Sequence, residues 1–338
     1  MPIVVGATRP GDTVPARAQS FVRSGEWASA AGAVACIEIG LVNNMPDAAL
    51  EATERQFVEV LEAASEGRLV RLHLFAMPEV PRGEAAKDYL GKAYAPIARL
   101  AETGLDALIV TGNEPRAAAL DREPYWDALA GLIDWAEHNT LSTIWSCLAA
   151  HAAVLHLDGV KRHQLEDKRF GVFDCDKLAE HPLLAGAPSP FFVPHARCND
   201  LREDELLTHG YRILTRSLHA GVDMFVKQWR SLFVFFQGHP EYDALSLQRE
   251  YLREIGRYLA RERQTYPAVP VNYFDAATQD KLARFEKRAK QQRHPALGSE
   301  LPALNLRTDI AAGSAATALF RNWLAYLAED TPAVLPAC

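Results

Sequence analysis

The chain has 338 residues, of which 49% are apolar and 23% are charged, and its formal net charge at pH 7 is −7. This length can hold one large domain or two modest ones, and the composition is ordinary for a globular enzyme. A general nucleic-acid binder would present a basic face, so the acidic balance argues against that class of protein. The longest apolar stretch, SLFVFF at residues 231–236, is too short to span a bilayer, and the N-terminus lacks the apolar segment of a signal peptide.

The first half of the chain alternates between strand-like and helix-like patterns. Residues 1–32 mix Pro, Gly, Arg and Ser without sustained periodicity, which predicts an N-terminal arm. Short apolar runs rich in β-branched residues then predict strands, and segments of helical period lie between them. The predicted strands lie at residues 33–42, 69–76, 105–112 and 141–146, and the predicted helices at about residues 50–65, 86–102 and 123–138. Strands that alternate with helices indicate βαβ units and a buried parallel sheet.

After residue 185 the pattern changes to closely spaced strands without helices between them, which predicts a partly antiparallel extension of the same sheet. An amphipathic helix is predicted over residues 243–263 and a last helix over residues 315–329. The chain between these helices, residues 264–312, contains several prolines and is expected to be mostly peripheral. The predicted strands are FFVPHARCND (191–200), YRILTRS (211–217), VDMFVKQ (222–228) and SLFVFFQG (231–238).

These patterns predict an α/β fold with a mostly parallel central sheet, flanked by helices and carrying a partly antiparallel extension. We expect a single domain over residues 33–330 and a C-terminal tail over residues 331–338. Ligand sites in open sheets of this kind form beyond the carboxyl ends of the strands. The candidate site residues are therefore those that follow the strands, at positions 43–47, 111–116, 147 and 238–241.

Cys147 stands where the predicted strand LSTIWS ends and the helical pattern LAAHAAVLHL begins. A thiol at a helix N-terminus faces the positive end of the helix dipole and several free N–H groups, and both favour the thiolate. A strand, a nucleophile and a helix in this order are the parts of a nucleophile elbow. Free cysteines are also common as inert core residues, so position alone leaves both interpretations open.

The segment FQGHPEYD, residues 236–243, favours the nucleophile. It follows an apolar strand, and His239 and Glu241 lie two residues apart, so they can face the same side of an extended segment. Glu241 can then accept a hydrogen bond from one ring nitrogen while the other nitrogen faces the thiol, as in a Cys-His-acid triad. The alternative is a turn that caps the next helix.

Gly112 is the last residue of the predicted strand and lies within the motif IVTGNEPR (109–116). A glycine at this position permits another backbone segment to approach closely. Its N–H and that of Leu148 are candidates for an oxyanion hole. The alternative is an ordinary turn glycine at the end of a strand.

The metal-binding patterns are weak. The five cysteines form no Cys-x-x-Cys pair, and their odd number fits reduced thiols in the cytoplasm better than a disulfide or zinc framework. His151 and His156 are five residues apart, a turn of roughly 140° around a helix, and therefore share no ligand face. We expect no metal site.

A cysteine at a βα elbow followed by His-Pro-Glu resembles the class I glutamine amidotransferase-like fold. The surrounding motifs are similar to the homoserine O-acyltransferase family on that fold, usually called homoserine O-succinyltransferase. They occur in the family's order and cover most of residues 35–330. The matching stretches are NNMP with TERQF (43–57), GLDALIVTG (104–112), YWDALAGLIDWAEHNTLSTIWSC (125–147), DKRFGVF (167–173), VPHARCND (193–200), GHPEYDALSLQREYLREI (238–255) and LFRNWLAYL (319–327).

The resemblance implies that Cys147 takes an acyl group from a coenzyme A thioester, with His239 as base and Glu241 as its orienting partner. The hydroxyl of L-homoserine then attacks the acyl-enzyme, in a step of methionine biosynthesis. The family's substrate-binding positions match here at Lys168, Arg197 and Arg253. The planar fork of an arginine suits a carboxylate or a phosphate. For each of these residues a surface charge or ion pair is the alternative.

The resemblance associates the choice of acyl donor with one aligned position. In the family, the loop after TG carries glutamate in acetyl-using members and glycine in succinyl-using members, and an ungapped count from Thr111 to Tyr125 places Arg116 there. An arginine can pair with the free carboxylate of a succinyl group, which favours succinyl-coenzyme A over acetyl-coenzyme A. The alternative is that Arg116 points to solvent or contacts a coenzyme phosphate, and that other residues select the donor. Other departures from the family pattern spare the triad: Asp47 and Ala48 stand where the family has a lysine pair, Leu148 where it has tryptophan and His151 where it has glutamine.

The triad alone leaves a glutaminase open, but that group typically surrounds its cysteine with glycines, and SCLAA has none. A non-catalytic binding protein on the same fold would be expected to lose a triad member. We therefore expect a cytoplasmic acyltransferase with acyl-coenzyme A as co-substrate and no permanently bound cofactor. Its expected partners are small-molecule substrates, L-homoserine and the acyl donor, rather than nucleic acid or membrane, with a homodimer as one option for assembly.

Overall fold

The computed structural model describes residues 3–6, 36–307 and 315–330. The apolar runs of the sequence form a central sheet whose strands are β1 (Ile3–Gly6), β2 (Cys36–Val42), β3 (Leu69–Ala76), β4 (Ala95–Pro96), β5 (Ala107–Val110), β6 (Ser142–Ser146), β9 (Arg212–Ile213), β12 (Met224–Gln228) and β13 (Leu232–Phe236). Within the described residues this sheet has nine strands in the order β1-β3-β2-β5-β6-β13-β12-β9, and β4 pairs with β3. Neighbouring strands from β1 to β13 are parallel, whereas β12 is antiparallel to both β13 and β9. The predicted α/β fold, mostly parallel with a partly antiparallel extension, is confirmed.

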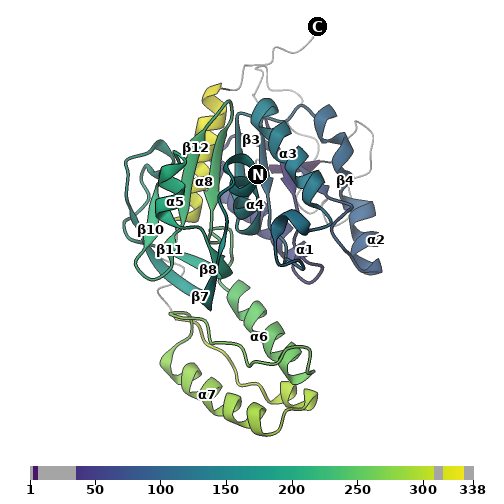
Figure 1. Cartoon of the computed structure of the whole chain (residues 1–338), viewed down its shortest axis with the longest axis vertical. Coiled ribbons are helices and arrows are strands. Elements are labelled where there is room, and N and C mark those ends of the chain that lie inside the picture. Colours follow the sequence, from purple (N-terminus) through teal and green to yellow (C-terminus); the bar gives the residue numbers. More distant parts are fainter. Residues whose placement is uncertain (1–2, 7–35, 308–314, 331–338) are drawn as a thin grey trace.

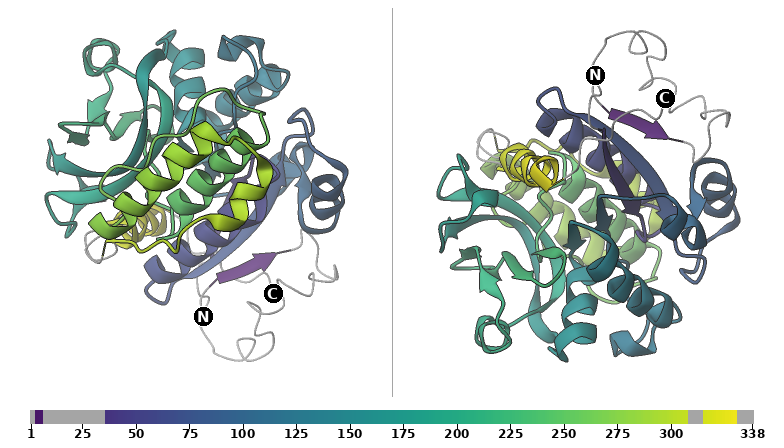
Figure 2. Two further views of the ribbon diagram at one scale, coloured as in Figure 1. Left: turned by 90° about the horizontal axis from the view of Figure 1, so that it is seen from below. Right: turned by 90° about the horizontal axis from the view of Figure 1, so that it is seen from above.

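Helices cover both faces of the central sheet, which explains why its middle strands are continuous apolar runs rather than alternating ones. Helices α1 (Leu50–Ala64) and α8 (Ala316–Asp330) pack on one face, against side chains such as Ile109. Helices α3 (Trp126–Asn139) and α4 (Leu148–Asp158) pack on the other face, against side chains such as Trp145 (Figures 1 and 2). The indole N–H of Trp323 donates to the Ser142 hydroxyl at 2.9 Å and ties α8 to β6.

A second sheet lies beside the first and was predicted only in part. Within the described residues it has four antiparallel strands in the order β11-β10-β7-β8. The sequence prediction assigned residues 191–200 and 215–217 to the extension of the central sheet, but they belong to this second sheet. The long strand β7 was not predicted, because its first half carries mostly polar, exposed residues. The bounds are β7 (His163–Lys177), β8 (Phe191–Asp200), β10 (Thr215–Ser217) and β11 (Gly221–Val222), with the short helix α5 (Glu203–Thr208) after β8.

Helices α6 (Ser246–Leu259) and α7 (Ala276–Gln291) form a lobe at one end of the molecule (Figure 1). In the left view of Figure 2 this lobe lies in front of the central sheet. It has its own apolar cluster, in which Tyr251 of α6 packs with Phe285 of α7 and with Phe170 of β7. The described part of the chain from 264 to 312 is therefore peripheral in position, as expected, but helix α7 was not predicted, and its apolar side is buried.

Two other predictions need correction or restriction. The predicted helix at 86–102 is divided into α2 (Glu84–Ala93) and a 3₁₀ helix (Ile97–Glu102), with β4 between them, because Pro96 lacks the N–H that a continuous helix requires. Residues 3–6 of the predicted arm form strand β1, paired in parallel with β3. The rest of the arm and the predicted tail at 331–338 lie outside the described residues, and the single domain over 33–330 stays a prediction. None of the described helices has the length and apolar character needed to cross a membrane.

Candidate active site

Cys147 occupies the turn between strand β6 and helix α4. Its φ of 53° lies in the left-handed region, which non-glycine residues rarely adopt and which costs about 1–3 kcal/mol. The Cys147 N–H donates to the Phe236 carbonyl at 2.7 Å, so the end of β13 holds the strained turn in place. The thiol is half-buried. This strained, tethered turn is the geometry of a nucleophile elbow.

His239 and Glu241 follow β13, the neighbour of β6 in the sheet, and both side chains are buried. Nδ1 of His239 lies 2.9 Å from a carboxylate oxygen of Glu241. The ring of His239 stacks on the ring of Tyr242, with centroids 4.2 Å apart, and its backbone N–H donates to the Pro194 carbonyl at 2.8 Å. Because Nδ1 of His239 is hydrogen-bonded to Glu241, Nε2 is the ring nitrogen that can interact with the Cys147 thiol.

The charged groups around His239 favour its role as the base for Cys147. Burial lowers the pKa of His239, but the Cys147 thiol and the Glu241 carboxylate beside it raise that pKa, and the net result is well above the ordinary value of histidine. The thiol and carboxylate also hydrogen-bond to the imidazole. A carboxylate in this position selects the tautomer of the histidine and stabilises its protonated form. The hydroxyl of Ser146 donates to the same Glu241 oxygen at 3.4 Å.

Gly112 lies against the first residue of α4. A Cβ built on Gly112 would fall 2.8 Å from both the backbone nitrogen and the Cβ of Leu148, so only glycine permits this approach. The close contact brings the backbone at positions 112 and 148 together beside Cys147, as an oxyanion hole requires. The oxyanion role of these two N–H groups stays a prediction.

A cavity of about 630 Å³ opens beside the triad, and Cys147 and His239 line it. Lys168, Arg197 and Arg253, which the sequence identified as substrate-binding candidates, line the same cavity. The structure therefore brings these candidates together with the nucleophile, although they come from β7, β8 and α6.

The three cationic side chains differ in whether protein groups already pair with their charge. The Lys168 ammonium lies 2.5 Å from a Glu254 carboxylate oxygen and 4.0 Å from the centre of the Phe170 ring. Arg197 is buried, and its guanidinium donates to Asp200 at 2.7 Å and to backbone carbonyls. Arg253 is exposed and makes no hydrogen bond or ion pair within the described part of the chain. Arg253 is thus the one of the three whose guanidinium is free to bind an anionic substrate group.

The structure does not bring Arg116 into the cavity. Its side chain is exposed, and neither its side chain nor its backbone lines the cavity, whereas the preceding Glu114 and Pro115 do. The backbone N–H of Arg116 donates to a Glu123 carboxylate oxygen at 2.7 Å, which fixes the loop with residue 116 turned outward. This geometry does not support the prediction that Arg116 contacts the acyl group.

The comparisons with known proteins agree with the family that the sequence motifs indicated. A family model described as homoserine O-succinyltransferase matches residues 2–333. The chain belongs to this family. It is 55% identical to a homoserine O-succinyltransferase of Rhodopseudomonas palustris, over 98% of this chain and 100% of the relative. It is 53% identical to a homoserine O-succinyltransferase of Bradyrhizobium japonicum, over 87% of this chain and 90% of the relative.

Among solved structures, a glutamine amido transferase from Methylobacillus flagellatus matches 87% of this chain and 94% of its own, at 14% identity and a TM-score of 0.48.

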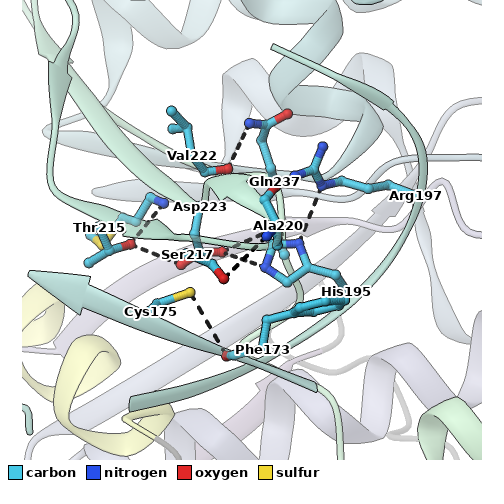
Figure 3. A network of polar contacts seen from close by, with 12 residues as sticks. Phe173, Cys175, His195, Arg197, Thr215, Ser217, Ala220, Val222, Asp223 and Gln237 are labelled. Carbon is cyan, nitrogen blue, oxygen red and sulfur yellow. Dashed lines mark hydrogen bonds and ion pairs between the residues drawn. The ribbon is translucent and has the colours of Figure 1, made fainter. Parts of the chain in front are cut away.

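Figure 3 shows a buried polar network that the sequence analysis missed; through Gly238 it adjoins His239. Asp223 accepts hydrogen bonds from the Thr215 hydroxyl at 3.0 Å and from the Gly238 N–H at 3.3 Å. A Cβ on Gly238 would meet the Asp223 carboxylate at 2.6 Å, so this position requires glycine. The network thereby fixes the backbone immediately before His239.

His195 completes this network. Its Nδ1 accepts from Arg197 Nε at 3.3 Å, and its Nε2 lies 3.5 Å from the Asp223 carboxylate. Burial lowers the pKa of His195 well below its ordinary value and raises the pKa of Asp223 to about 6. Ligand-type atoms of Cys175, His195 and Asp223 lie within 4.8 Å of one another. Because both Asp223 oxygens already accept hydrogen bonds, we assign no metal to this cluster, and the expected absence of a metal site stays a prediction.

Proposed function

We propose that this chain transfers a succinyl group from coenzyme A to the hydroxyl of L-homoserine through an acyl-enzyme at Cys147. The observation that carries the proposal is the triad of Cys147, His239 and Glu241, which opens onto a cavity of about 630 Å³ in a member of the homoserine O-succinyltransferase family. The acyl-coenzyme A acts as a co-substrate, and the chemistry needs no permanently bound cofactor.

The first half-reaction acylates the thiol. The proton of Cys147 passes to Nε2 of His239, and the sulfur attacks the thioester carbonyl. The N–H groups of Gly112 and Leu148 stabilise the negative oxygen of the tetrahedral intermediate. The C–S bond to coenzyme A then breaks, and the departing thiolate takes the proton from His239. Glu241 holds the imidazole in the productive orientation during both proton transfers.

The second half-reaction forms the ester. The hydroxyl of homoserine loses its proton to His239 as its oxygen attacks the acyl carbon of the thioester at Cys147. The bond between the acyl carbon and Sγ then breaks, and the sulfur recovers a proton from the imidazolium. O-succinylhomoserine leaves, and the triad returns to its starting protonation state.

Substrate binding in this proposal depends on the cations of the cavity. Arg253 binds the carboxylate of homoserine, because its guanidinium has no partner within the described residues. Lys168 is positioned to bind an anionic group of a substrate, if it exchanges its contact with Glu254. Arg197 supports the wall of the cavity, since its donors are already taken by the protein.

Intact-mass spectrometry after mixing the chain with succinyl- or acetyl-coenzyme A tests the proposal. We expect stoichiometric acylation in the absence of homoserine, loss of the acyl group when homoserine is added, and no acylation of the Cys147→Ala variant. A glutaminase assay run in parallel separates the alternative. Release of glutamate from glutamine without acylation by either donor would reject the acyltransferase in favour of a glutaminase with the same triad.

The site is built for small molecules, and we propose a cytoplasmic enzyme without a nucleic-acid or membrane partner. Sedimentation of the full chain tests whether the active unit is a homodimer.

A further inference from the structure

The cationic side chains that line the cavity fall into two groups. Most of them are already paired with a carboxylate: Lys168 and Arg263 with Glu254, Arg197 with Asp200, Arg249 with Asp243 and Arg257 with Glu114. Arg162 and Arg253 also line the cavity, but neither makes a hydrogen bond or ion pair within the described residues. A cavity with two unpaired guanidinium groups is suited to a pair of substrates that bring two carboxylates.

Arg162 is the more enclosed of these two groups. It lies between α4 and the start of β7, its side chain is half-buried, and its Nη1 atom is buried without a hydrogen-bond partner. A buried N–H of a charged group that finds no acceptor costs free energy. The cavity therefore favours a ligand that offers Arg162 an acceptor.

Arg162 lines the same cavity as Cys147, and the two side chains interact electrostatically. Burial lowers the pKa of Arg162, and the nearby Tyr125, Glu123 and Cys147 raise it. Glu123 does not neutralise Arg162 by a direct ion pair: one of its oxygens accepts the N–H groups of Arg116 and Ala117, at 2.7 Å and 2.6 Å. The other Glu123 oxygen is buried without a partner, so Arg162, which lines the cavity, has no protein acceptor among the described residues.

His151 adds a second unpartnered polar atom at the same place. It lies four residues after Cys147, on the same face of α4, and it lines the cavity. Its Nε2 is 3.0 Å from the Gln237 amide oxygen, whereas its Nδ1 is buried and has no partner in the described structure. Arg162 and His151 thus both line the cavity, and each has a buried polar atom without a protein partner among the described residues.

We propose that Arg162 binds the free carboxylate of the succinyl group on Cys147 and thereby selects succinyl- over acetyl-coenzyme A. This inference rests on the proposed function and assigns a residue to its donor specificity. The acyl carbonyl lies at the N–H groups of Gly112 and Leu148, and the two methylene groups of succinate extend from there along the cavity wall to the guanidinium. Arg253 remains for the carboxylate of homoserine. Arg116, exposed and outside the cavity, has no part in this selection.

The test compares wild type with Arg162→Gln and Arg162→Lys, and uses Arg116→Gln as the matched control. The rate of Cys147 acylation by each donor is followed by intact mass without homoserine, and kcat/KM is then measured with homoserine present. Arg162→Gln should lower kcat/KM for succinyl-coenzyme A by about 10- to 100-fold, the value of a charge-assisted hydrogen bond, and change the acetyl reaction by less than about threefold. For succinyl-coenzyme A, the kcat/KM of Arg162→Lys should lie between those of wild type and Arg162→Gln, because an ammonium keeps the charge without the planar fork. Arg116→Gln should leave the donor preference unchanged.

Two results would overturn the assignment of Arg162. An equal loss with both donors would mean that Arg162 serves the thiol or the coenzyme rather than the acyl carboxylate, and an unchanged donor ratio would mean that it contacts neither acyl group. If thermal unfolding shows that Arg162→Gln is not folded, the donor ratio of Arg162→Lys decides instead. If wild type is acylated by neither donor, the proposed function fails first and the inference with it, and this is visible before any variant is compared.

Discussion

Replacing Glu241 by Gln isolates the role of charge in the triad, because the substitution removes a charge and almost no volume. The Glu241 carboxylate is buried and lies 2.9 Å from Nδ1 of His239. A carboxylate accepts the Nδ1 proton and leaves Nε2 free to take the proton of Cys147. The amide of Gln can instead donate to Nδ1, which stabilises the opposite tautomer, with its proton on Nε2. In that tautomer His239 is unable to act as the base.

The size of the effect follows from these contacts. A hydrogen bond to a charged group contributes roughly 1.5–3 kcal/mol, which corresponds to a factor of about 10 to 150 in rate. The wrong tautomer deepens the loss, and in a serine triad the equivalent change costs about 10⁴-fold in kcat. We therefore expect kcat of Glu241→Gln to fall by about 10²- to 10⁴-fold, with the KM values for both substrates nearly unchanged.

The same substitution has a second, independent readout. Burial lowers the pKa of His239, while Cys147 and Glu241 raise it, so removing the Glu241 charge should lower that pKa. NMR titration of the His239 ring measures this shift, and Glu79→Gln, at an exposed position outside the cavity, is the control for a generic loss of charge. A kcat within about tenfold of wild type, or an unchanged pKa of His239, would refute the reasoning.

Three further variants test the remaining parts of the site. Cys147→Ala should abolish acyl transfer by several orders of magnitude while the thermal unfolding curve stays that of a folded protein, and residual activity within about tenfold of wild type would remove Cys147 as the nucleophile. Arg253→Ala should raise the homoserine KM by about 10- to 100-fold, with Arg284→Ala on the exposed side of α7 as the control, and an unaltered KM would exclude Arg253 from the amino-acid site. Gly112→Ala should lower kcat by at least about tenfold, because its Cβ would lie 2.8 Å from the Leu148 nitrogen and force the two backbone segments apart; a normal kcat would contradict the oxyanion assignment.

The central sheet and the triad could be predicted from the sequence because the triad residues directly follow buried strands of that sheet. Strands β5 and β13 are apolar and buried at every position, so their runs are easily recognised, and parallel pairing with β6 places the residues after these strands at one edge of the sheet. Strand β7 could not be predicted, since its first half is mostly polar with no buried residue, and it therefore lacks both a continuous apolar run and a clean alternation. Helix α7 was missed although a signal existed: Leu282, Phe285 and Ala289 have helical spacing, and Asp275 caps the helix by accepting the Thr278 N–H at 2.7 Å.

The cationic residues show a different limit. Lys168, Arg197 and Arg253 were found through motifs, and all three do line the cavity, but sequence does not reveal which charges the protein has already neutralised. Arg162 follows a helix and precedes a polar strand, a setting typical of a solvated surface charge. Its significance is that Nη1 is buried and unpaired, a property that exists only once α4 and β7 are packed together.

Several unfavourable features of the described chain lie around the candidate active site. Cys147 holds a left-handed backbone, Asp223 and His195 are buried ionisable groups, and Arg162 has a buried donor without an acceptor. Each of these costs stability where it stands, and together they persist because the apolar strands and the helices on both faces fix the backbone around them. The strain is at the nucleophile, both Asp223 oxygens of the buried network next to His239 accept hydrogen bonds from protein groups, and Arg162, with its unpaired donor, lines the cavity. A site that had only to be stable would have paired Arg162 internally, as it paired Arg263 with Glu254. The one unpaired guanidinium enclosed beside the thiol is therefore the feature that links this fold to a donor with a free carboxylate.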